Sequence, residues 1–68
     1  MNQTIRVNGQ DETLAAATIA ALLAEKEMGE ARGIAVALNG AVVPRAAWPD
    51  TRLSPGDAIE IVRAQQGG

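Results

Sequence analysis

Residues 54–64 read Ser-Pro-Gly-Asp-Ala-Ile-Glu-Ile-Val-Arg-Ala, which is a turn sequence followed by a strand pattern. Pro fixes its own φ and Gly accepts a positive φ, so the first four residues are typical of a tight turn. Side chains alternate between the two faces of an extended chain. Ile59 and Ile61 therefore share one face, while Glu60 and Val62 share the other. The pattern predicts a strand over residues 58–64 with one strongly apolar face.

Four further segments have the alternation or composition of strands, namely residues 4–7, 11–14, 34–38 and 41–43. Asn8-Gly9 separates the first two and Asn39-Gly40 separates the last two, and Asn-Gly is a strong hairpin signal. Pro44 ends the segment 41–43 because it has no N–H to donate to a sheet. That segment is open to either a strand or a loop, so we expect a sheet of four or five strands.

One helix is predicted between residues 18 and 28. Thr18 suits the N-cap position, where its hydroxyl accepts a hydrogen bond from a free backbone N–H. Ile19, Leu22 and Leu23 form one apolar stripe on that helix. Gly29 is expected to end it in a left-handed conformation, directly after Met28. One helix covering one face of the sheet gives a single two-layer α+β domain over residues 1–64.

The composition argues against an enzyme. The 68 residues include no His and no Cys, which removes the common general base, the thiolate nucleophile and the usual zinc ligands. The net charge is −2 and the basic residues are scattered, so no nucleic-acid interface is expected. No apolar run approaches the roughly 20 residues of a membrane span, and no signal peptide is visible. We therefore expect a cytoplasmic protein that does not bind metal, nucleic acid or membrane.

The last four residues, Gln65, Gln66, Gly67 and Gly68, have the composition of a flexible tail. Glycine lacks Cβ, so a Gly-Gly end can pass through a channel too narrow for side chains. Fully extended, four residues reach roughly 13 Å. An ionised carboxylate is a poor electrophile, and adenylation by ATP in a partner would activate it. The alternative is an inert, frayed end.

Candidate partner-binding residues lie close to this tail in the sequence or on the adjoining sheet. Val62, Ala35 and Ala37 are expected to share the sheet face opposite the helix, where exposed apolar side chains commonly mark a binding site. Scattered surface apolar residues are the alternative. Arg63, one residue before the end of the predicted strand, is either solvated or directed at an acidic groove of a partner.

The segment Pro44-Arg45-Ala46-Ala47-Trp48 has two interpretations. In the first, which we favour, Pro44 ends a strand and Trp48 closes the open end of a small core. In the second, Arg45 or Trp48 contacts a partner, because both residue types are enriched at interfaces.

Taken together, these segments resemble the bacterial sulfur carrier family ThiS. The resemblance runs along essentially the whole chain and rests on Asn39-Gly40, Val42-Val43-Pro44-Arg45, Trp48, Leu53, the stretch from Gly56 to Val62 and the terminal Gly67-Gly68. It implies a β-grasp, ubiquitin-like fold and a role in building the thiazole ring of thiamin.

The resemblance also implies that separate partner proteins carry out the chemical steps. A ThiF-type enzyme would adenylate Gly68 using ATP and magnesium, which this chain itself does not bind. A sulfur donor system would convert the adenylate to a thiocarboxylate, and the thiazole synthase ThiG would receive the sulfur. The carrier is expected to be monomeric on its own.

Four alternatives stay open at this point. The small subunit of molybdopterin synthase also ends in Gly-Gly on a β-grasp fold, but that family is longer and richer in Phe, and this chain has no Phe and no Tyr. A carrier for another sulfur pathway, such as cysteine synthesis, is a second alternative. The others are a ubiquitin-like modifier and an interaction module with an inert tail.

Overall fold

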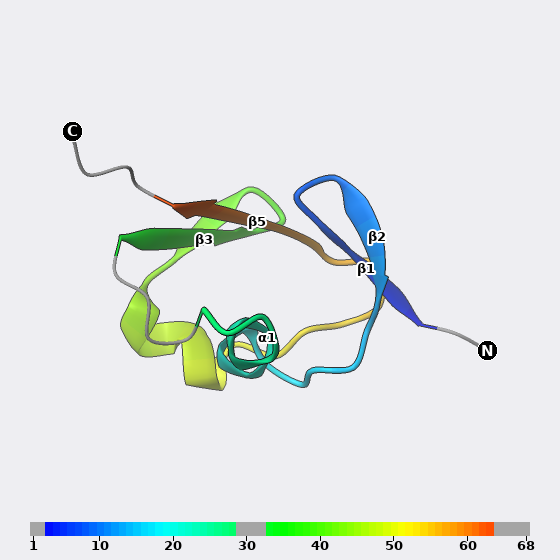
Figure 1. Cartoon of the computed structure of the whole chain (residues 1–68), viewed down its shortest axis with the longest axis horizontal. Helices are drawn as coiled ribbons and strands as arrows, with labels where there is room; N and C mark the ends of the chain where they lie inside the picture. The colour runs from blue at the N-terminus through cyan, green and yellow to red at the C-terminus, as the bar shows by residue number, and fades with distance from the viewer. Residues whose placement is uncertain (1–2, 29–32, 64–68) are drawn as a thin grey trace.

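The computed structural model describes residues 3–28 and 33–63. These residues form one sheet, one α-helix and one 3-10 helix in two layers (Figure 1). The elements are, in chain order, β1 (Thr4–Val7), β2 (Gln10–Thr13), α1 (Ile19–Glu25), β3 (Ile34–Leu38), β4 (Ala41–Val43), the 3-10 helix η1 (Arg45–Asp50) and β5 (Ala58–Arg63).

The sheet has five strands in the order β2-β1-β5-β3-β4, with β5 at its centre. β5 runs parallel to β1, with Val7 opposite Ile59, and antiparallel to β3, with Val36 opposite Ile61. Each neighbour of β5 belongs to a hairpin, and the two hairpins therefore flank the central strand. This mixed sheet with one helix on one face is the predicted β-grasp fold, and residues 41–43 are a strand.

Both predicted hairpin turns are confirmed. Asn8 and Asn39 each have φ +52°, and the glycine after each also has a positive φ. Positive φ at both central residues is the type I′ geometry that matches the twist of a hairpin. The predicted second strand was placed one residue too late, because the two-residue turn lets Gln10 pair directly with Val7.

The core lies between the sheet and α1. Its buried side chains come from both layers and from the connecting segments: Ile5, Val7, Ala16, Ile19, Leu22, Leu23, Val36, Trp48, Leu53 and Ile59. The predicted alternation along β5 is confirmed, since Ile59 is buried and Ile61 partly buried, while Glu60 and Val62 are exposed. No helix among the described residues is long and apolar enough to cross a membrane.

The helix begins where predicted but ends earlier. The Thr18 hydroxyl accepts a hydrogen bond from the Ala21 N–H at 3.1 Å, which confirms the N-cap. The predicted end at Gly29 is wrong, because α1 ends at Glu25 and Glu27 takes the left-handed conformation with φ +60°. Gly29 itself lies outside the described residues.

Two hydrogen bonds define this helix end as a Schellman motif. The Met28 N–H donates to the Leu23 carbonyl at 2.8 Å, and the Glu27 N–H donates to the Ala24 carbonyl at 3.1 Å. Met28 then packs against the core. This burial offsets the roughly 1–2 kcal/mol that a left-handed conformation costs a residue with a Cβ.

Candidate functional site

The residues that precede the tail lie on the central strand of the sheet. Gln65, Gln66, Gly67 and Gly68 lie outside the described residues, and Arg63 is the last residue of β5. β3 pairs with β5 along its whole length, from Leu38 opposite Ile59 to Ile34 opposite Arg63. The strand that leads to the tail is therefore held on this side up to its last residue.

On its other side, β5 is held by a side chain. Pairing between β1 and β5 ends at Val7 and Ile59. The amide of Asn8 continues it, because its Oδ1 accepts the Ile61 N–H at 2.8 Å and its Nδ2 donates to the Ile61 carbonyl at 3.3 Å. Asn39 braces the start of the strand, where its Oδ1 accepts the Ala58 N–H at 2.9 Å.

The sequence predicts both asparagines in turns and does not predict these contacts. The Asn8 amide reaches a residue 53 positions away in the sequence. No local pattern reports such a contact, because it depends on how β1 and β5 are placed side by side.

The sheet face away from α1, here called the outer face, carries a group of small apolar residues. Ala35 lies opposite Val62, and Ala37 lies opposite Val42, so the four side chains occupy one face of three neighbouring strands. Val42 and Val62 are 77% and 60% exposed and are the exposed large hydrophobic residues of the described chain. We call Ala35, Ala37, Val42 and Val62 the outer patch.

The structure thus brings together three of the residues that the sequence singled out, and adds Val42. The signal for Val42 was the alternation of residues 41–43. Once Val43 faces the core, Val42 must face outward.

The two arginine candidates lie elsewhere. Arg63 follows Val62 directly and so points to the opposite face of β5, the side of Ile59 and Ile61. Arg45 begins η1, in the layer of α1, and its guanidinium carbon lies 4.6 Å from the centroid of the Trp48 ring. This is a cation–π contact across the helix.

Trp48 belongs to the core, as the favoured interpretation predicted. Its side chain is only 4% exposed, and its Nε1 donates a hydrogen bond to the Val43 carbonyl at 2.8 Å. This bond gives the buried indole N–H an acceptor, and it links η1 to the last residue of β4. Trp48 is therefore not available to a partner in this conformation.

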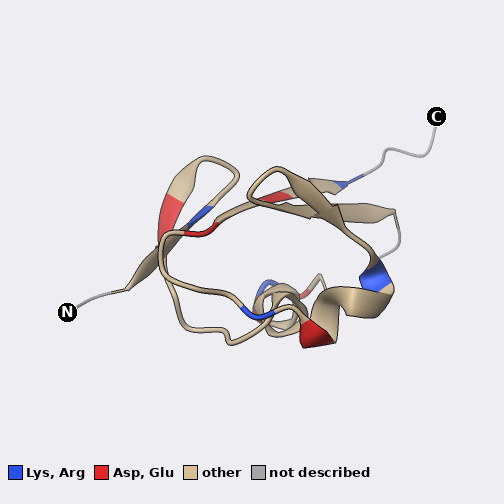
Figure 2. Cartoon of the chain, turned by 180° about the vertical axis from the view of Figure 1, so that it is seen from behind, with Lys and Arg blue, Asp and Glu red and all other residues tan. Residues whose placement is uncertain are grey.

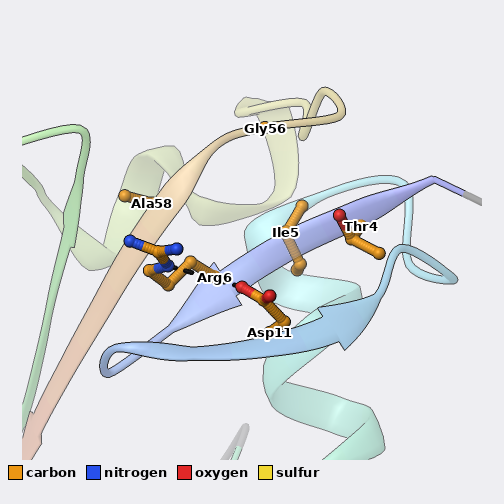
Figure 3. Close-up of a pocket in the computed structure, with 6 residues that line it drawn as sticks. All are labelled: Thr4, Ile5, Arg6, Asp11, Gly56 and Ala58. Atoms are coloured by element: carbon orange, nitrogen blue, oxygen red, sulfur yellow. Dashed lines mark hydrogen bonds and ion pairs between the residues drawn. The ribbon is translucent and has the colours of Figure 1, made fainter.

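A pocket of about 270 Å³ opens on the other half of the outer face (Figure 3). Thr4, Arg6, Asp11 and Ala58 line it, together with Ile5 and Gly56. Arg6 Nε lies 3.4 Å from Asp11 Oδ1, so the two charged side chains of the pocket pair with each other. The pocket lies at the start of β5, whereas the tail follows its end.

The described residues offer no assembled metal-binding group. No three His, Cys, Asp or Glu side chains among residues 3–28 and 33–63 lie close enough to hold a metal ion. Figure 2 shows that the charged positions are distributed over both layers instead of gathering on one surface. The candidate functional region is therefore the end of β5 together with the outer patch beside it.

Comparison with known proteins agrees with this geometry. A family profile described as the ThiS family matches residues 5–68. A crystal structure of the thiamine biosynthesis protein ThiS from Geobacter metallireducens is similar with a TM-score of 0.79 and 32% identity, covering 96% of this chain and 99% of that chain. An NMR solution structure of a thiamine biosynthesis protein from the same organism is similar with a TM-score of 0.74 and 34% identity. The match covers 100% of this chain and 88% of that chain. Comparison with curated proteins gave no match.

Proposed function

Since the chain belongs to the ThiS family, we propose that it is a sulfur carrier for thiamin biosynthesis and a co-substrate of other enzymes. The observation that carries this proposal is the family match, which extends to the terminal Gly67-Gly68. The two similar structures, both of thiamine biosynthesis proteins, support the same pathway. The absence of His and Cys from the sequence is consistent with chemistry located on the terminal carboxylate.

In the proposed reaction, Gly68 is activated by a ThiF-type enzyme that binds ATP and magnesium. A carboxylate oxygen of Gly68 attacks the α-phosphorus of ATP, and pyrophosphate leaves. A donor at the oxidation level of sulfide then bonds to the carbonyl carbon of the acyl-adenylate, and AMP leaves. The product is a terminal thiocarboxylate, from which the thiazole synthase ThiG takes the sulfur.

The folded body would present this terminus to each partner. β5 is fixed on both sides up to Ile61, so its direction is set before the tail begins. The outer patch lies on the same strand and its neighbours, and its exposed apolar surface is suited to a partner interface. Arg63 and Arg45 lie off the outer patch, and in this proposal they contact a partner beyond its edge.

A reconstituted reaction tests the pathway. Purified chain, ThiF-type enzyme, ATP, magnesium, sulfide and ThiG with its remaining substrates are combined, and thiazole product is measured against the amount of chain. We expect product to depend on the chain and to disappear when Gly68 is deleted. Equal product from the chain lacking Gly68 would contradict the carrier role, and conjugation of the chain to lysines of other proteins would favour a ubiquitin-like modifier.

A further inference from the structure

Glu60 is a charged residue set among the apolar residues of the outer face. It lies opposite Ala37 on β3, and Val42 follows on β4 in the same cross-strand row. Ala58 and Val62, two residues before and after it on β5, share its face. Ala37, Ala58 and Val62 therefore adjoin this carboxylate on the central strand, and Val42 lies one strand beyond Ala37. On the β1 side the neighbour is Asn8, whose amide is bound to the Ile61 backbone.

The Glu60 carboxylate has no partner among the described residues. Its side chain makes no ion pair and no hydrogen bond within residues 3–28 and 33–63. Arg6 is the basic residue at the outward positions of the five strands, and it lies opposite Ala58, one step away diagonally. Its Nε is directed at Asp11 instead, at 3.4 Å.

A partner that covers the outer patch would also remove water from Glu60. An apolar surface alone is a poor match, because a buried carboxylate without a counter-charge is strongly unfavourable. A Lys or Arg set within that apolar surface would compensate this loss and would also fix the docking register. The charge of Glu60 therefore specifies one feature of the partner.

Building on the proposed carrier function, we propose that Glu60 is a specificity-determining residue of the interface with the activating enzyme. The occupant of the outer patch is an apolar surface of that enzyme that carries a Lys or Arg against the Glu60 carboxylate. The apolar residues provide contact area, and Glu60 selects for a basic group at its centre.

Binding measurements with charge variants test this proposal. Glu60→Gln removes the charge with little change in shape, and Glu60→Lys reverses it. Glu25→Gln and Glu25→Lys are matched controls, because Glu25 is an exposed carboxylate at the end of α1, in the opposite layer. The dissociation constant of each chain for the ThiF-type enzyme is measured by calorimetry at low and high salt.

We expect Glu60→Lys to weaken binding at least about 30-fold, as for a broken charge pair in a desolvated interface. The dissociation constant of Glu60→Gln should lie between those of Glu60→Lys and the wild type. It should also depend less on salt concentration than that of the wild type. Both Glu25 variants should stay within about twofold of the wild type, since surface charges remote from an interface contribute little. Among enzyme variants with one interface Lys or Arg changed to Glu, one should restore binding of Glu60→Lys.

Two results would overturn the proposal. Binding of Glu60→Lys within twofold of the wild type would mean that Glu60 stays solvated in the complex. Tighter binding by Glu60→Gln would mean that the carboxylate meets no counter-charge. In either case, normal thiazole formation by the same variants would leave the carrier function standing, whereas failure of the wild type to bind or to be activated would remove both proposals.

Discussion

Asn8 holds a left-handed backbone conformation at φ +52° and uses its side-chain amide to continue the pairing of β1 with β5. Asparagine tolerates this conformation better than most residues, because its short polar side chain can hydrogen-bond nearby. The same residue thus closes a hairpin and holds the strand that leads to the tail. Asn39 repeats the arrangement in the other hairpin, at Ala58.

We predict that Asn8→Ala destabilises the fold by about 2–4 kcal/mol, since it loses both hydrogen bonds to Ile61 and strains the turn. Asn8→Gly is the matched control, because glycine accepts the positive φ and lacks only the amide. Asn8→Gly should therefore lose less folding stability than Asn8→Ala. In both variants the Ile61 N–H should exchange with solvent faster, and unchanged protection of Ile61 in both would contradict the bracing role.

The Trp48 side chain both packs in the core and donates a hydrogen bond to the Val43 carbonyl. We predict that Trp48→Ala costs about 3–5 kcal/mol of unfolding free energy because it empties the core beside η1. Trp48→Phe should cost less, since it keeps most of the ring and loses the bond to Val43. Urea unfolding followed by circular dichroism measures both, and an unchanged midpoint for Trp48→Ala would contradict the core assignment.

Among the secondary-structure elements, the end of α1 allows a test in which two glycine substitutions should have opposite effects on stability. Glu27 has φ +60°, so Glu27→Gly should stabilise the protein by about 1 kcal/mol through relief of backbone strain. Glu25 is the last helical residue, so Glu25→Gly should destabilise it by about 1 kcal/mol. Thermal unfolding of the two variants compares them directly. A loss of stability in Glu27→Gly would show that the left-handed cap is not strained.

Most elements could be predicted from local sequence because their causes are local. Asn-Gly fixes both hairpins, Thr18 fixes the start of α1, and the alternation of β5 fixes its faces. The end of α1 could not be predicted, because packing of Met28 on the core turns the chain two residues before Gly29. η1 was missed for a related reason, since Trp48 draws residues 45–50 into the core layer.

At the level of the whole molecule, the two faces of the sheet differ in what covers them. One face packs on α1 and η1 (Figure 1). The other face carries the outer patch. The sequence predicted Ala35, Ala37 and Val62 on the outer face from alternation alone. The same alternation also carries the outward position of Val42 and the opposite direction of Arg63. The place of Arg45 could not be predicted, because it follows from η1 and from the contact of Arg45 with Trp48.

In the proposed function, Gly68 bears the transferred sulfur. The most direct measurement is the intact mass of the chain before and after incubation with a ThiF-type enzyme, ATP, magnesium and sulfide. We expect a mass gain equal to the replacement of one oxygen by sulfur, located at the C-terminus by fragmentation and lost when Gly68 is deleted. An unchanged mass, with an enzyme shown to be active on another carrier, would contradict it.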